Sequence, residues 1–164
     1  MDLSKPAMAG LALALTAAVS LSAFAGSFSD KTDRFTGSRS VIWSSIPDKP
    51  DSFAMSTYAF YVKGDPKPGL YKLSLITWGD RWQFLNCHHS NWLVDGKPAP
   101  QLEFEYKSEM AGSATSERFD LYPNRALLQQ IANAKLFEYS LCGTEGRVSD
   151  ADLDGIRRVL EASK

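Results

Sequence analysis

The stretch Gln101-Leu-Glu-Phe-Glu-Tyr-Lys107 decides the fold class, because apolar and polar side chains alternate along it without a break. Successive side chains of a β-strand point to opposite faces, so the alternation predicts a strand with one dry and one wet face. The inward residues are Leu102, Phe104 and Tyr106, and the outward residues are Gln101, Glu103, Glu105 and Lys107. Such a strand is typical of an antiparallel sheet that is covered on one side.

Short runs of the same kind, separated by turn residues, extend in both directions from this strand and predict further strands. They lie at 40–43, 53–62, 70–78, 81–85, 91–94, 119–121 and 136–142. Residues 26–34 are polar, and we expect them to form a loose leading segment. Helical spacing of apolar residues predicts one helix after Pro123-Asn124 and a second over Ser149–Ala162. The chain is therefore expected to be an α+β protein: a mainly antiparallel, twisted sheet with two late helices packed on one face.

Residues 1–25 are typical of a cleavable secretory signal peptide. Lys5 gives a weakly basic start, an uncharged apolar run covers Ala7–Val19, and Ala23-Phe24-Ala25 is a cleavage site that precedes Gly26. The alternative is an uncleaved anchor over Pro6–Ser29, but its densely apolar part is shorter than the roughly 20 residues that span a bilayer. We expect a periplasmic or secreted protein whose residues 26–164 form a single globular domain, since no repeat or linker divides them.

The cysteine count and the charge narrow the possible functions. Cys87 and Cys142 are the two cysteines, and an even number in an exported chain predicts a disulfide. The formal net charge is −1, which leaves no cationic footprint for nucleic acid or for an anionic membrane surface. No phosphate-binding loop, dinucleotide-binding motif or zinc-protease motif occurs, so no cofactor is expected.

The segment from Asp150 to Glu161 matches the pattern of a calcium-binding EF-hand loop. The carboxylates that would bind calcium are those of Asp150, Asp152, Asp154 and Glu161. The segment before the pattern is β-like rather than helical, and Arg157 stands where such a loop normally has an aliphatic residue. A helix capped by Ser149, with acidic residues in its first turn, explains the same residues more simply.

A zinc or copper site and imidazole-based catalysis would both depend on His88 and His89, the two histidines of the chain. Adjacent side chains on a strand point to opposite faces, and a disulfide would remove Cys87 as a ligand, so a metal site would need further groups, with Met55 as one candidate. No Gly-x-Ser-x-Gly motif accompanies any serine, and the acids at 103 and 105 lie on a wet face. A metal or small-ligand carrier and a small hydrolase built from scattered acids remain the alternatives.

Aromatic residues supply the best candidate for a binding surface. Trp78 and Trp82 flank a predicted tight turn that also carries Arg81, and Trp92 follows shortly. Tryptophan and arginine dominate the binding energy of protein interfaces, although a tryptophan pair across a hairpin can equally close a core. The leading hypothesis is a small, non-enzymatic binding domain that recognises another envelope or secreted protein, as an inhibitor, an immunity factor or an accessory subunit. The oligomeric state is left open.

Overall fold

A computed structural model describes residues 26–46, 53–99 and 101–164, so the predicted signal peptide over 1–25 lies outside the described residues. The α+β prediction is confirmed, since antiparallel strands dominate and both helices come late. The strands are β1 (Gly26–Thr32), β2 (Arg39–Ser45), β3 (Ala54–Tyr61), β4 (Leu70–Gly79), β5 (Ser90–Val94), β6 (Lys97–Pro98), β7 (Phe104–Ala111), β8 (Ala114–Leu121), β9 (Phe137–Leu141) and β10 (Thr144–Arg147). The helices are α1 (Arg125–Asn133) and α2 (Asp150–Ala162).

The described strands form two antiparallel sheets rather than the one that the sequence predicted. Sheet A has six strands in the order β1-β2-β3-β4-β8-β7, and sheet B has four in the order β10-β9-β5-β6. Residues 26–32 were expected to be loose but form β1, because every one of them pairs with a residue of β2 and gains the backbone hydrogen bonds of a sheet. The predicted strand at 81–85 is absent, and residues 80–89 form a loop between the two sheets.

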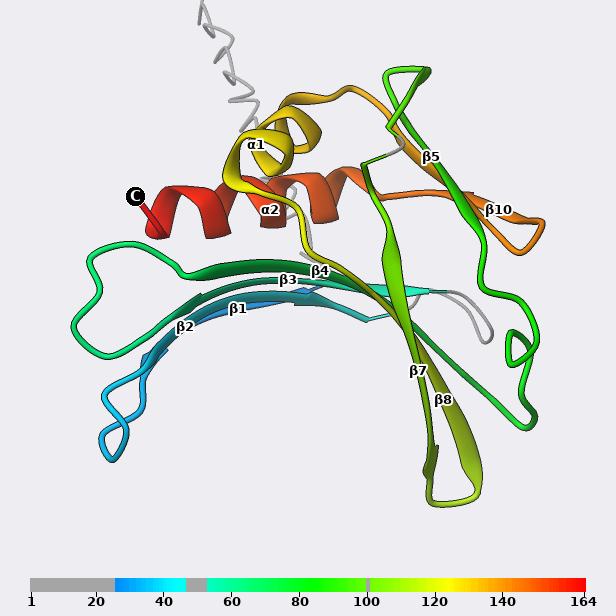
Figure 1. The fold of residues 1–164 in the computed structure, drawn as a ribbon, viewed down its shortest axis with the longest axis horizontal. Helices are drawn as coiled ribbons and strands as arrows, with labels where there is room; N and C mark the ends of the chain where they lie inside the picture. The colour runs from blue at the N-terminus through cyan, green and yellow to red at the C-terminus, as the bar shows by residue number, and fades with distance from the viewer. Residues whose placement is uncertain (1–25, 47–52, 100) are drawn as a thin grey trace, which may run out of the picture.

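The two helices lie over the same face of sheet A, as predicted (Figure 1). Helix α2 packs on β2 and β3, and α1 packs on α2. Trp43 of β2 fixes the position of α2, since a methyl group at Gly155 would overlap its indole ring. The indole Nε1 of Trp43 also donates a hydrogen bond to the buried carboxylate of Asp152 at 2.9 Å. Neither described helix is both long and apolar enough to cross a bilayer.

The opposite face of sheet A, called here the open face, is covered by none of the described elements (Figure 1). Sheet A curves away from the helices, so the open face lies on the inside of the curve. The pairing register assigns alternate residues to this face: Ile42 and Ser44 of β2, Ser56, Tyr58 and Phe60 of β3, Lys72, Ser74, Ile76 and Trp78 of β4, Ser116, Arg118 and Asp120 of β8, and Glu105, Lys107 and Glu109 of β7. The described strands thus form a concave, polar and aromatic surface that no other described element covers.

Candidate functional site

The middle of the open face is a row of small and acidic side chains that runs across the strands. Cross-strand pairing places Ser44 beside Ser56, Ser56 beside Ser74, Ser74 beside Asp120, and Asp120 beside Glu105. Ser74 and Asp120 are 0% exposed even though none of the described elements covers this face. Longer side chains of the neighbouring rows, Lys72, Lys107 and Arg118, contact the Asp120 carboxylate, to which Ser74 is hydrogen-bonded.

Asp120 holds three cationic side chains in place. Its carboxylate accepts a hydrogen bond from Ser74 Oγ at 2.6 Å and one from Arg118 Nε at 3.1 Å. Lys107 Nζ lies 3.3 Å and Lys72 Nζ 3.8 Å from the same carboxylate. Burial raises the pKa of Asp120, but the hydrogen bond from Ser74 and the charges of Lys72 and Arg118 outweigh it and hold the pKa below its usual value. The buried carboxylate is therefore an ionised anchor that orders the cations above it.

Lys72 is the most enclosed of these cations, with a side chain that is 16% exposed. Its ammonium lies 4.4 Å from the centre of the Tyr58 ring, which in turn stacks on Phe60 at 5.4 Å. Burial lowers the pKa of Lys72, and the nearby Asp120 raises it by less. Aromatic rings and a partly desolvated cation thus stand side by side in the centre of the open face.

The four predicted binding residues do not form one surface. Trp78 is 41% exposed and belongs to the open face, in a row with Ser116 and Glu109. Arg81 is exposed and Trp82 is half-buried, both in the loop after β4. Trp92 does not belong to an exposed surface: it is 4% exposed, stacks on Phe137 at 5.5 Å and donates a hydrogen bond to Ser90 Oγ. Its register on β5, opposite Tyr139 of β9, directs the indole into the core.

Hydrogen bonds to Glu117 and a disulfide help to attach loop 80–89 to the fold. The carboxylate of Glu117, 1% exposed, accepts hydrogen bonds from the backbone N–H groups of Gln83 at 2.7 Å and Phe84 at 2.8 Å, and from the Tyr106 hydroxyl at 2.6 Å. Burial and the Glu117 carboxylate raise the pKa of Tyr106 to about 12. At the far end of the loop the predicted disulfide between Cys87 and Cys142 is confirmed. Residues 80–89 therefore do not form a strand, because the backbone N–H groups of Gln83 and Phe84 bind the Glu117 side chain instead of a neighbouring strand.

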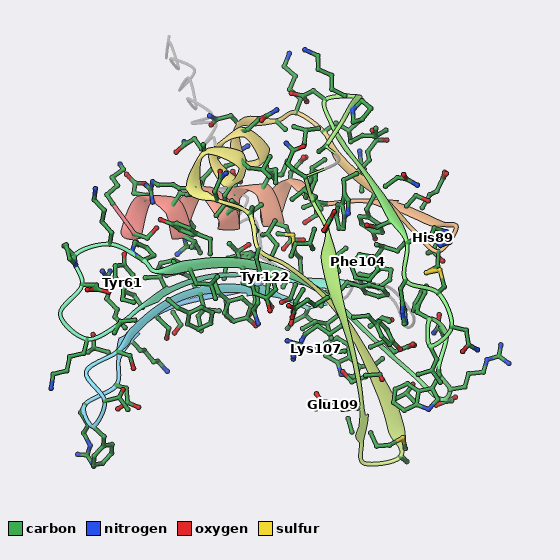
Figure 2. All side chains as sticks on the ribbon, in the orientation of Figure 1. Tyr61, His89, Phe104, Lys107, Glu109 and Tyr122 are labelled. Atoms are coloured by element: carbon green, nitrogen blue, oxygen red, sulfur yellow. A yellow bond between two sulfur atoms is a disulfide. The ribbon has the colours of Figure 1, made fainter. Side chains whose placement is uncertain are left out.

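The two histidines lie along a groove of about 570 Å³ between sheet B and the start of β7. His88 stacks on Tyr106 at 4.9 Å, and His89 lies on the other side of β7 from Lys107 and Glu109 (Figure 2). His89 Nδ1 lies 3.2 Å from Cys87 Sγ, and Cys142 Sγ completes a group of three potential ligand atoms within 4.8 Å of one another. Both sulfurs are bonded to each other, so neither is a thiolate, and no such group in the described part of the chain includes His88.

The acidic residues of the calcium pattern are spread along α2, which is continuous from Asp150 to Ala162. Ser149 caps this helix by accepting a hydrogen bond from the backbone N–H of Asp152, as the simpler interpretation predicted. Asp152 is buried against the indole of β2, Asp154 pairs with Arg157, and Glu161 lies 3.3 Å from Lys164. These four carboxylates are side chains of a capped helix and do not converge on one point.

A hydrolase built from acids would need carboxylates that converge in a cleft. The buried carboxylates of the described residues are those of Glu117, Asp120 and Asp152. Glu117 points to the core side of β8 and Asp120 to the open face, while Asp152 lies on α2. Each is already engaged by its own hydrogen-bond donors. A shallow hollow on sheet B does contain Glu138 and Glu145, but Glu145 is exposed.

Comparisons of the chain with profiles of known protein families, with curated protein sequences and with solved structures find no match. Sequence reasoning selected Trp78 but missed Lys72, Arg118 and Asp120, the charged centre of the open face. The available signal was that Lys72 and Ser74 alternate with the apolar residues Tyr71, Leu73 and Leu75.

Proposed function

We propose that this chain is an exported, non-enzymatic binding domain that recognises another envelope or secreted protein through the open face of sheet A. One observation supports this proposal above the others: a concave sheet face without a covering layer of described residues carries Trp78, Tyr58 and Phe60 together with Arg118. Aromatic residues and arginine are enriched in the centres of protein interfaces and contribute most of their binding energy.

The ordering of the cations by Asp120 adds to this support. A flexible lysine or arginine loses roughly 0.5–1.5 kcal/mol of side-chain freedom when an interface immobilises it. Arg118 and Lys107 are already held by a carboxylate that is itself fully buried, so part of that loss has occurred before any partner arrives. The open face is thus pre-organised for binding.

The exported location is supported by the disulfide between Cys87 and Cys142, because disulfides persist in oxidising compartments such as the periplasm and the extracellular space. The proposed mature chain begins at Gly26, which is also the first residue of β1. Cleavage at the predicted site would therefore leave the folded strand intact.

Site-specific photo-cross-linking tests the proposal. A photoreactive phenylalanine analogue is placed at Tyr58 or Trp78 on the open face, or at Gln129 on the exposed side of α1 as a control, and each protein is irradiated in an envelope extract. We expect one partner protein, identified by mass spectrometry, at both open-face positions and not at Gln129. Equal cross-linking from all three positions, or none from the open face, would contradict the proposal, as would a product made of two copies of this chain.

The purified partner then allows a quantitative test. Trp78→Ala is expected to weaken binding about 30-fold, the effect of an interface hot spot worth about 2 kcal/mol. Phe35→Ala is the matched control, because Phe35 is also a large, solvent-exposed aromatic residue but lies in the loop between β1 and β2. Calorimetric titration of both variants measures the difference, and equal losses would place the interface elsewhere.

A further inference from the structure

The ammonium group of Lys72 lacks a hydrogen-bond acceptor among the described residues. The nearest carboxylate oxygen, on Asp120, lies 3.8 Å away, beyond hydrogen-bonding distance, and the other close group is the face of Tyr58. An ammonium has three N–H donors, and removing them from water without replacement is unfavourable. The lowered pKa of Lys72 reflects the same loss of hydration. The ammonium can therefore donate a hydrogen bond to an acceptor that a ligand brings to this position.

Arg118 offers unused donors next to Lys72. Its Nε donates to Asp120 Oδ2, while its two terminal nitrogens donate to none of the described residues. Lys72 and Arg118 flank the same buried carboxylate, with Lys72 nearest to Oδ1 and Arg118 bound to Oδ2, so both cations face the same point of the open face. A guanidinium fork beside an ammonium is the donor set that binds a carboxylate with two or more charge-assisted hydrogen bonds.

The charges that face this point fit one bound carboxylate at a time. Lys72, Lys107 and Arg118 carry three positive charges, and the acids that contact them, Asp120 and Glu105, carry two negative ones, which leaves a formal charge of +1. Glu109 stands in the next row of the open face. A nucleic acid requires many clustered cations, and this surface carries three. One carboxylate side chain matches the available charge.

We infer that the partner of the open face presents an acidic segment, and that Lys72 and Arg118 form the subsite that receives one of its carboxylates. This inference rests on the proposed function and adds the chemistry of the partner. The stacked rings of Tyr58 and Phe60 border the subsite and would contact the apolar neighbours of that acidic residue.

The test uses a defined probe, a capped hexaglutamate peptide, with a capped hexaglutamine peptide and inorganic phosphate as comparisons. Each is titrated into the isotopically labelled, disulfide-bonded protein, and side-chain resonances of lysine and arginine are followed by NMR. We expect saturable shifts at Lys72 and Arg118 with hexaglutamate, at a Kd on the order of 1 mM, and no saturable shift with hexaglutamine. Equal responses to the two peptides, or phosphate binding more tightly than hexaglutamate, would overturn the inference.

Two variants keep the test specific. Lys72→Gln is expected to weaken hexaglutamate binding about tenfold, the loss of one charge-assisted contact, whereas Lys67→Gln, at an exposed lysine of the turn between β3 and β4, is expected to leave it unchanged. Unchanged binding by Lys72→Gln would refute the subsite. If a partner cross-links to the open face but its affinity is insensitive to Lys72→Gln, the acidic chemistry is wrong and the proposed function stands. If hexaglutamate binds at Lys72 and Arg118 but no partner cross-links to the open face, the carboxylate subsite stands and the proposed function is wrong.

Discussion

Removing the carboxylate of Glu117 is the perturbation with the largest expected effect on the loop that joins the two sheets. Glu117→Ala leaves three donors without their acceptor: the N–H groups of Gln83 and Phe84 and the hydroxyl of Tyr106. A hydrogen bond to a charged acceptor contributes about 1.5–3 kcal/mol, which gives roughly 5–9 kcal/mol if none is replaced. Part of this is recovered because loop 80–89 can move and admit water, so we expect unfolding to require about 3–5 kcal/mol less free energy.

Urea unfolding followed by circular dichroism measures this change on the disulfide-bonded protein. Glu117→Gln keeps one carbonyl acceptor but turns an amide N–H₂ toward donors, so a smaller loss of about 2 kcal/mol is expected. Glu109→Gln is the control, because Glu109 lies on the same hairpin and is exposed, and its change should stay within about 0.5 kcal/mol.

Amide hydrogen exchange gives an independent measurement of the same contact. The N–H groups of Gln83 and Phe84 should exchange much faster in Glu117→Ala than in the wild type. The exchange rates of amides in the centre of β3 and β4 should change only as much as the change in the global free energy of unfolding requires. A loss below about 1 kcal/mol together with unchanged protection at both amides would refute the reasoning. In that case the disulfide, and not Glu117, would hold the loop.

Three further perturbations test other parts of the structure. Gly155→Ala should cost about 2 kcal/mol in a urea titration because the added methyl overlaps the indole beneath α2, whereas Gly69→Ala, in open space, should be nearly neutral. Replacing Cys87 and Cys142 by serine should cost about 4 kcal/mol, the loop entropy for a separation of 55 residues, and a loss below 1 kcal/mol would mean that the unfolded chain is not restrained by the bond. Asp120→Asn should cost about 3 kcal/mol at pH 7. Because folding lowers the pKa of Asp120, the carboxylate stabilises the folded protein fully above its unfolded pKa of about 4, and this stabilisation is lost as the pH falls through the folded pKa. The difference in stability between Asp120→Asn and the wild type should therefore vanish in acid. A difference that does not depend on pH would contradict this assignment.

The sequence by itself determined the features that depend on local periodicity and composition. Alternation around Phe104 and Tyr106 placed both side chains against the core, and the helical spacing after Ser149 identified α2 together with its N-cap. The even number of cysteines predicted the disulfide between Cys87 and Cys142. These features are local because a strand, a capped helix and a cysteine count each leave their pattern within a few neighbouring residues.

Other features depended on which strands become neighbours, and only the tertiary structure decided them. The polar segment 26–32 became β1 through pairing with β2, and segment 81–85 lost its strand because Glu117, far along the chain, binds its amides. Register alone turned Trp92 inward and left Trp78 exposed. The cluster of Lys72, Arg118 and Asp120 joins β4 to β8, strands separated by a long stretch of chain. The alternation at Lys72 and Ser74 marks a polar face of β4, but local periodicity does not say which distant residues meet that face, so only the folded protein brings Arg118 and Asp120 to it.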